Sequence, residues 1–201
     1  GATGMWMHSM ITLSSVLVSV LICFVIGVPL GVLASYNKWY RDIQNVVLDA
    51  MQTLPYFCYL IPVLMFFGGN IVSAVIATVI YSVPPIIRLT ALGLSQVSGG
   101  YSEVSKSFGG TGIQTLNKVK FPLAVPSLVM GFNQTVIMAF AMQIVTPLIG
   151  GKGLGLQVFN ALQRSDTGRG LSAGLAIVLL AIIIDRITHA WTKKQRQALG
   201  L

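Results

Sequence analysis

The chain has 201 residues, of which 54% are hydrophobic and only 9% are charged, and its mean hydropathy is +0.79. A soluble domain of this size needs a charged surface, so the composition excludes one and indicates an integral membrane protein. The net charge of +8 comes from residues at the ends of apolar runs, not from one basic helix face, which argues against nucleic-acid binding. Histidine and cysteine are too few and too scattered to form a catalytic set or a metal site, so we expect neither.

Five apolar runs are each long enough to cross a bilayer, which takes about 20 residues. They occupy approximately residues 10–34, 46–67, 71–94, 123–149 and 171–191. The sequence therefore predicts an all-α integral membrane fold, with five transmembrane helices in a single domain over residues 1–201. An odd number of spans places the two termini on opposite sides of the membrane.

Lysine and arginine are distributed unequally between the two sides that these spans define. If the loop 98–122 is cytoplasmic, ten positive residues lie inside: Lys38, Arg41, Arg88, Lys106, Lys118, Lys120, Arg186, Lys193, Lys194 and Arg196. The outer side holds three: Lys152, Arg164 and Arg169. Because positive residues favour the cytoplasmic side, we expect the N-terminus outside and the C-terminus in the cytoplasm.

The first span contains Gly27 and Gly31, a spacing that permits the close approach of a second helix. Pro29 lies between them, so the alternative is a bend near the membrane edge.

The second span contains Pro55, which is followed by three aromatic residues, Tyr56, Phe57 and Tyr59. A proline inside a span frees a backbone carbonyl, which is tolerated where it faces protein or a water-filled cavity. Aromatic faces attract quaternary ammonium ions by about 0.5–2 kcal/mol per contact. These rings are candidates for a translocation path; the alternative is that they pack between helices.

Arg88 follows a pair of prolines near the inner end of the third span. A charge within the membrane is costly and is usually paired. Asp49 and Asp185, each near the inner end of its span, are the acidic candidates. We expect a structural ion pair at the inner mouth, with a gating pair as the alternative.

The fourth span carries the polar residues Asn133 and Gln134, which we expect to face another helix or the path. Met138 and Met142 lie on one face of the same helix and either line the path or fill the core. The glycine-rich stretch 150–155 lacks the Ser or Thr that follows Gly-Lys in a nucleotide-binding loop, so it predicts a flexible outer turn.

The polar loop 98–122 predicts two short helices. Ser102 can cap the first, which would run to Phe108 and end at Gly109-Gly110, where glycine tolerates a left-handed conformation. Thr111 and Gln114 have the spacing of a capping box and would start the second. A helix–glycine–helix between spans indicates either a docking surface for a soluble partner or an amphipathic loop on the bilayer.

This loop resembles the EAA loop (E-A-A-x3-G-x9-I-x-L-P) of binding-protein-dependent ABC importer permeases. Glu103, Gly109 and Pro122 match the pattern, while Val104-Ser105 replace the two alanines and Val119 and Phe121 replace isoleucine and leucine. In that family the loop carries the coupling helix, which sits in a groove of the ATP-binding subunit. The resemblance therefore implies that the coupling residues are Ser102, Glu103, Val104, Ser105, Lys106, Ser107, Phe108, Gly109, Gly110 and Pro122.

Four longer stretches, 51–68, 83–97, 103–128 and 175–188, are similar to the glycine betaine/proline betaine branch of these permeases. The resemblance implies the type I importer permease fold and an osmoprotectant importer in a bacterial or archaeal cytoplasmic membrane. It implies a substrate-binding protein, which could dock on the outer turn with Arg164, Asp166 and Arg169. It also implies two permease chains, which we expect to be a homodimer, with a paralogous partner chain as the alternative, and two ATPase subunits that bind ATP and magnesium. We expect no cofactor in this chain.

The alternative function is a secondary transporter or channel of small cations that is driven by an ion gradient. Such a protein would show internal repeats and carboxylates at mid-membrane. We find no repeat, and Asp49 and Asp185 lie near the inner ends of their spans. A membrane scaffold that recruits a cytosolic protein is a third possibility, against which the polar, interrupted spans argue.

Overall fold

The computed structural model describes residues 2–97 and 99–198, and over these residues its regular structure is helical. The α-helices are α1 (Ala2–Tyr36), α2 (Lys38–Thr53), α3 (Phe57–Phe67), α4 (Ile71–Ser82), α5 (Pro84–Ser95), α6 (Gly99–Ser107), α7 (Gly112–Thr115), α8 (Phe121–Met142), α9 (Leu154–Gln163) and α10 (Thr167–Ala198). A π-helical segment, η1 (Leu116–Lys120), joins α7 to α8, and a 3-10 helix, η2 (Thr146–Ile149), follows α8. This confirms the expected all-α membrane fold.

Four helices of the described ranges are long and apolar enough to cross a membrane: Met5–Tyr36, Ile71–Ser95, Gly112–Met142 and Thr167–Thr188. The second expected span is not one straight helix, because α2 and α3 are bent by 95° at residues 54–56 and count as a span only together. Pro55 explains the break, since it has no N–H for the helical ladder and its ring clashes with the preceding turn. The fourth expected span also ends early, at Met142, and residues 143–149 form a turn and η2.

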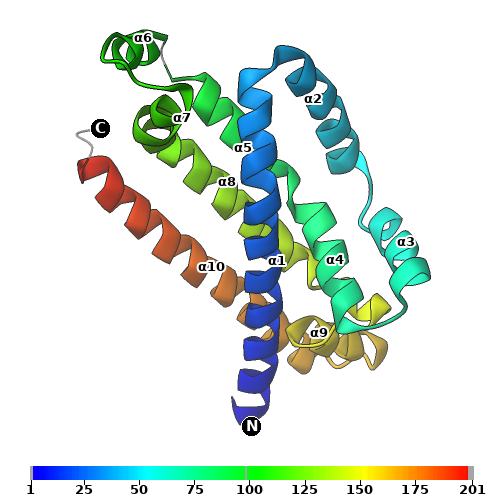
Figure 1. The fold of residues 1–201 in the computed structure, drawn as a ribbon. Helices are drawn as coiled ribbons and strands as arrows, with labels where there is room; N and C mark the ends of the chain where they lie inside the picture. The colour runs from blue at the N-terminus through cyan, green and yellow to red at the C-terminus, as the bar shows by residue number, and fades with distance from the viewer. Residues whose placement is uncertain (1, 98, 199–201) are drawn as a thin grey trace.

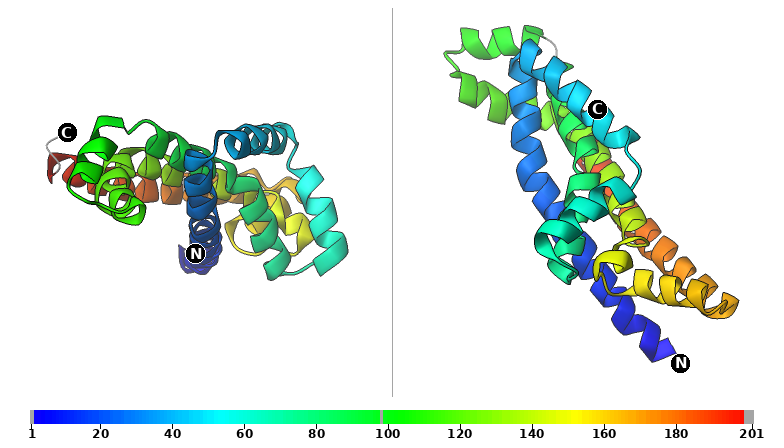
Figure 2. Two further views of the ribbon diagram at one scale, coloured as in Figure 1. Left: turned by 45° about the horizontal axis from the view of Figure 1, so that its top comes forward. Right: turned by 90° about the vertical axis from the view of Figure 1, so that its right-hand side faces the viewer.

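The helices are arranged in an elongated bundle in which α5 packs between α1 and α8, and α10 packs on α8 and α9 (Figure 1). The helices α6 and α7 lie at the same end of the bundle as the end of α10. The beginning of α1 lies at the opposite end, near α9, as the right-hand view of Figure 2 also shows. The polar loop and the first residues of α1 are therefore separated by the length of the bundle.

Small residues bring α5 close to both of its neighbours. A Cβ on Gly31 of α1 would lie 2.5 Å from the Cβ of Thr90 and 2.7 Å from the carbonyl oxygen of Ile87. A Cβ on Gly93 of α5 would lie 2.6 Å from the Cβ of Ser127 in α8. These distances are shorter than any real Cβ contact, so the close approach predicted from the glycine spacing is confirmed. Pro29 lies inside α1, which continues past it to Tyr36.

Candidate functional site

The loop between α5 and α8 is a helical hairpin. The first helix, α6, ends at Ser107, and the chain reverses at Gly109, whose φ of +76° is a left-handed conformation that glycine adopts without strain. The backbone N–H of Gly110 donates to the carbonyl oxygen of Ser105 at 2.9 Å, which closes the turn. The glycine reversal predicted from the sequence is confirmed.

The predicted start of this hairpin is wrong. Because α6 begins at Gly99, Ser102 lies within the helix and cannot be its N-cap. The side chains of Ser102 and Lys106, and the whole of Ser98, lie outside the part of the chain that the structure describes.

The second helix of the hairpin begins with the predicted capping box, which is confirmed. The backbone N–H of Gln114 donates to the Thr111 hydroxyl at 3.4 Å, and the backbone N–H of Thr111 donates to the Gln114 side-chain oxygen at 2.9 Å. The hydroxyls of Ser105 in α6 and Thr115 in α7 share a hydrogen bond of 2.8 Å. This bond ties the two helices together at a position where the EAA pattern has an alanine.

Large apolar side chains on this hairpin face away from the bundle. Phe108 is 89% exposed and Ile113 is 74% exposed, and Val104 and Tyr101 are also exposed. A hollow of about 450 Å³ lies between the two helices, and its walls include Tyr101, Val104, Phe108, Gln114 and Lys118. Exposed apolar side chains next to a hollow on an otherwise polar loop are typical of a protein-binding surface.

The hairpin is connected to the membrane helices without a break. Residues Gly112–Met142 form one continuous helical stretch, in which η1 links α7 to α8 and Pro122 occupies the first turn of α8. Pro122 has no N–H, and it directly follows the π-helical segment η1, in which the Phe121 N–H donates to the Leu116 carbonyl oxygen and the helix is wider where the proline ring would meet the preceding turn. The Lys120 ammonium group lies 5.0 Å from the centre of the Tyr36 ring at the end of α1. A displacement of the hairpin would therefore reach both α8 and α1.

The break between α2 and α3 holds a cluster of tyrosines. Because Pro55 cannot donate to the carbonyl oxygen of Met51, this oxygen lacks its helical donor, and the hydroxyl of Tyr59 donates to it instead. The rings of Tyr56 and Tyr81 have centroids 4.9 Å apart, and those of Tyr59 and Tyr81 lie 5.9 Å apart, edge to face. Tyr81 of α4 was missed from the sequence, where only its position three residues before the prolines of α5 singles it out. Phe57 begins α3 and is exposed.

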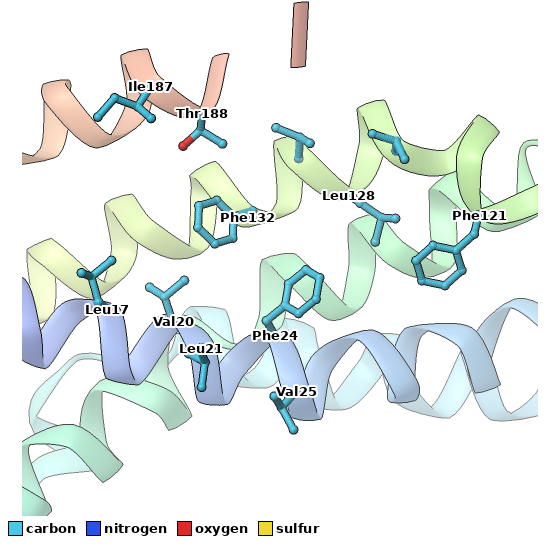
Figure 3. A pocket seen from close by; sticks show the side chains of 12 residues that line it. Leu17, Val20, Leu21, Phe24, Val25, Phe121, Leu128, Phe132, Ile187 and Thr188 are labelled. Atoms are coloured by element: carbon cyan, nitrogen blue, oxygen red, sulfur yellow. The ribbon is translucent and has the colours of Figure 1, made fainter. Parts of the chain in front are cut away.

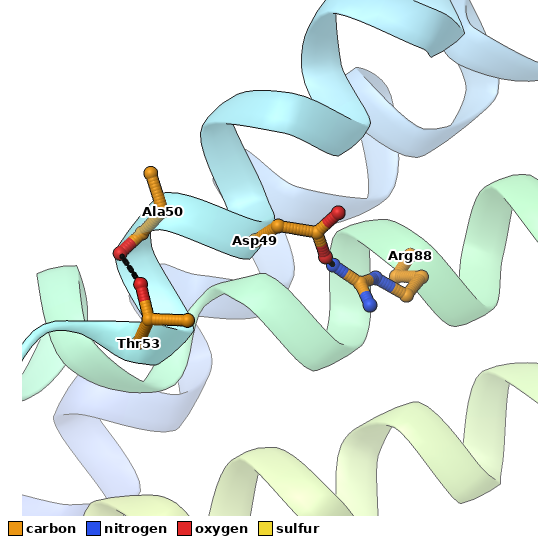
Figure 4. Close-up of polar contacts among 4 residues, drawn as sticks. All are labelled: Asp49, Ala50, Thr53 and Arg88. Carbon is orange, nitrogen blue, oxygen red and sulfur yellow. Dashed lines mark hydrogen bonds and ion pairs between the residues drawn. The ribbon is translucent and has the colours of Figure 1, made fainter.

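Asp49 of α2 and Arg88 of α5 form an ion pair, in which Arg88 Nη2 and Asp49 Oδ1 are 2.6 Å apart (Figure 4). The Asp49 side chain is 64% exposed and the Arg88 side chain 38%, so the pair lies at the edge of the bundle. Asp185, the other acidic candidate, lies on α10, which packs against α8 and α9. The structure thus brings Arg88 together with Asp49.

The four candidates on α8 lie on different sides of the helix. Gln134 is exposed and Met138 is half-buried, whereas Met142 is fully buried in a cluster with Leu60 and Ile149. Asn133 is only 6% exposed, and neither its side-chain nitrogen nor its oxygen has a hydrogen-bond partner among the described residues. Met142 therefore fills the core, and the four residues do not line one surface.

A pocket of about 890 Å³ lies between α1, α8 and α10 (Figure 3). Leu17 and Phe24 of α1, Phe132 of α8 and Ile187 of α10 are among its walls, and Thr188 contributes the one polar side chain among the lining residues. Because the walls of this pocket are almost entirely hydrocarbon, it favours an apolar chain over a charged solute, whose burial there without a partner would be costly.

The outer turn is more tightly packed than the sequence suggests. Gly151, Gly153 and Gly155 are buried, and a Cβ on Gly150 would lie 2.6 Å from the backbone nitrogen of Asn70. Lys152 is exposed. The glycines here permit close packing, so the expected flexible turn is not what this segment forms. Arg164, Asp166 and Arg169 are exposed nearby, and Asp166 accepts the Arg169 backbone N–H at 3.0 Å.

The family of this chain follows from its similarity to known protein families. The binding-protein-dependent transport system inner membrane component family matches residues 27–197. The chain belongs to this family. The predicted membership of the binding-protein-dependent permeases is thereby confirmed, and it favours a transport subunit of the inner membrane over an ion-gradient-driven transporter.

Two relatives from this family are similar over nearly all of the chain. The glycine betaine/proline betaine transport system permease protein ProW of Escherichia coli (strain K12) is 44% identical over 196 residues, which cover 98% of this chain and 55% of ProW. The glycine betaine/carnitine transport permease protein GbuB of Listeria monocytogenes serotype 1/2a (strain 10403S) is 45% identical over 191 residues, 95% of this chain and 68% of GbuB. The chain thus spans about half the length of ProW.

A solved structure shows the same fold. A chain of the MetNI methionine ABC transporter in an inward-facing conformation has a TM-score of 0.76 and 25% sequence identity to this chain. The match covers 90% of this chain and 93% of that chain. Nearly the whole chain therefore has the fold of an ABC importer permease.

Proposed function

We propose that this chain is the permease subunit of a binding-protein-dependent ABC importer for quaternary-amine compatible solutes of the glycine betaine and proline betaine type. Family membership supports the transport role, and the names of ProW and GbuB support the substrate class. The chain itself carries no ATPase role in this proposal. ATP and magnesium bind to two copies of a partner ATPase.

The observation that carries the proposal is the exposed hairpin α6–α7, whose second helix continues into α8. Phe108 and Val104, with the exposed carboxylate of Glu103, form the surface that enters a groove of the ATPase. Gly109 allows the reversal that presents α6. When the two ATPase subunits close, they pull the hairpin, and the continuous helix from Gly112 transmits the movement to the membrane spans.

In this proposal the hairpin and the C-terminus face the cytoplasm, and the N-terminus lies outside, as the distribution of positive residues favours. The opposite end of the bundle then receives the substrate-binding protein. Lys152, Arg164 and Arg169 are exposed there, and a hollow of about 780 Å³ is bounded by Phe67, Asn70 and Lys152, among others.

Two copies of this chain enclose the path, because a bundle of four to five spans is too small to do so alone. The side formed by α3 is a suitable partner surface, since its Met65 and Phe66 are among the most exposed apolar residues. Tyr56 and Phe57 are exposed on this side and line the path, and Tyr59 lies buried behind them. Gln134 and Met138 of α8 are the polar and flexible candidates farther along it, whereas Asn133 and Met142 contribute through packing.

The test is uptake by the reconstituted complex of permease, ATPase and binding protein in lipid vesicles. We expect the ATPase to co-purify with the permease, and uptake of glycine betaine to require ATP hydrolysis and the binding protein. Uptake by the permease alone, without nucleotide, would overturn the proposal and favour a gradient-driven carrier. Labelling of Lys106 from the external side of intact cells would overturn the orientation.

A further inference from the structure

We propose that Tyr56, Tyr59 and Tyr81 form a binding site for a quaternary ammonium group inside the membrane part of the chain. This inference rests on the proposed function, because it assumes that such a group passes through the permease. It goes beyond that function in giving the permease a substrate site of its own, and in assigning to it Tyr81 of α4.

The cluster lies where two interrupted helices meet. The α2–α3 segment breaks at residues 54–56, and the span Ile71–Ser95 is interrupted at Val83, between α4 and α5. Tyr81 is near the middle of this 25-residue span. Non-helical backbone at membrane depth is tolerated where it is buried in protein or lines a water-filled cavity. The cluster therefore lies at a depth where a solute could be held between an outward and an inward opening.

Helix ends of both polarities meet at the cluster. Helix α2 ends at Thr53 with a partial negative charge, whereas α3 begins at Phe57 and α5 at Pro84 with partial positive charges. Pro84 and Pro85 have no N–H to offer to the carbonyl oxygens of Ile80 and Tyr81, four residues earlier. These two carbonyl oxygens are therefore the backbone groups near the cluster that can offer negative charge to a positively charged group.

The three side chains suit a quaternary ammonium group in particular. Such a group has no N–H, so hydrogen-bond acceptors alone cannot select it, whereas aromatic faces attract it by cation–π contact. The rings of Tyr56 and Tyr81 are inclined at 47° with centroids 4.9 Å apart, so they are in contact and a cation would bind on the exposed side of the pair, not between the rings. The hydroxyl of Tyr59 donates to Met51, which fixes the position of its ring behind them.

The cluster is accessible from one side. Tyr56 is 39% exposed, Tyr81 is half-buried, and Tyr59 is buried beneath them. The exposed side is that of α3, which we assign to the path between two copies. A solute in the path would meet Tyr56 first and Tyr81 next. Mere packing of three rings between helices, the competing explanation, would predict no effect of a solute on this region.

The chain provides its own reporter for this site. Both of its cysteines are unbonded; Cys23 is buried, and Cys58 is exposed in the first turn of α3, next to Tyr59. The experiment measures the rate at which a maleimide alkylates Cys58 in the complete, nucleotide-free complex in lipid vesicles. The probes are glycine betaine and tetramethylammonium chloride. Neopentyl alcohol, in which an uncharged tert-butyl group takes the place of the trimethylammonium group, is the neutral control.

We expect both quaternary ammonium probes to slow the alkylation of Cys58 and the neutral alcohol to leave it unchanged. Tyr81→Phe keeps the ring and should keep the protection. Tyr81→Leu removes one cation–π contact and should raise the concentration needed for half-protection about 2- to 30-fold. Equal protection of the wild type and Tyr81→Leu, or equal protection by the neutral alcohol, would overturn the proposal.

Two further measurements keep the outcomes distinct. If Tyr81→Leu fails to assemble with the ATPase, Tyr56→Leu replaces it, because the Tyr56 side chain is more exposed and its loss disturbs packing less. ATP-dependent uptake of glycine betaine is measured on the same preparation. Uptake without protection of Cys58 overturns the tyrosine site alone, whereas no uptake by an assembled complex overturns the proposed function.

Discussion

The carboxylate of Asp49 and the guanidinium of Arg88, 2.6 Å apart, join the first half of the bent span α2–α3 to the second half of the span Ile71–Ser95. Asp49 lies in α2, before the break at Pro55, and Arg88 lies in α5, after the interruption at Val83. The pair connects the two segments on the side of their breaks that leads toward the coupling hairpin. Any movement that separates α2 from α5 must open it.

Charge removal at this pair distinguishes a structural from a gating role. Asp49→Asn should lower the free energy of unfolding by no more than about 1 kcal/mol, because both side chains are partly exposed to screening. A pair that only stabilises the fold would leave the uptake rate nearly unchanged. If the pair acts as a gate, its loss would change the uptake rate or the uncoupled ATPase activity. The double exchange Asp49→Arg with Arg88→Asp would then restore the wild-type values. Thermal unfolding and uptake are measured together; a double exchange no better than the single changes would contradict a direct pairing.

The glycines between α1 and α5 should tolerate no side chain. Gly31→Ala places a Cβ against Thr90 and the Ile87 backbone, and the overpacking should cost about 1–3 kcal/mol. Gly174→Ala in α10 is the matched control, since a Cβ there meets nothing within 4 Å and alanine favours the helix by about 1 kcal/mol. Thermal unfolding in detergent should therefore shift downward for Gly31→Ala only. An equal shift for both variants would contradict the close approach of α1 and α5.

The hydrogen bond between Ser105 and Thr115 should stabilise the hairpin. Thr115→Val leaves the half-buried Ser105 hydroxyl without this partner and should cost about 0.5–1.5 kcal/mol. Ser105→Ala should cost less, because the Thr115 hydroxyl also donates to the Thr111 carbonyl at 3.1 Å. Hydrogen exchange of α6 and α7 reports the effect. The double variant should lose little more than Thr115→Val alone, and full additivity would show that the two hydroxyls act independently.

The reversal at Gly109 should be needed for coupling. A Cβ on Gly109 meets nothing within 4 Å, so Gly109→Val acts through its positive φ, at a cost of about 1–3 kcal/mol for a bulky residue. We expect this variant and Glu103→Lys to lose ATP-driven uptake while their abundance in the membrane stays normal. Gly112→Ala, where a Cβ also meets nothing and φ is not left-handed, is the control and should keep uptake. Persistent uptake with both changes would refute the coupling role.

Much of the fold and of the coupling hairpin could be predicted from local sequence patterns. The apolar runs, the reversal at Gly109 and the capping box of Thr111 and Gln114 could all be read from neighbouring residues. The start of α6 could not. Ser102 has the chemistry of a cap, but the helix begins three residues earlier, and a cap is only one of several ways to satisfy the first N–H groups of a helix.

By itself, the sequence determined that the chain crosses a membrane as helices and carries a polar hairpin between two spans, because hydropathy, capping and glycine conformations are local properties. Only the tertiary structure decided that Arg88 pairs with Asp49, that Tyr81 joins Tyr56 and Tyr59, and that Met142 is part of the core. These relationships join segments distant in the chain, and their geometry depends on how helices pack at the breaks caused by prolines. No periodicity within one segment contains that information.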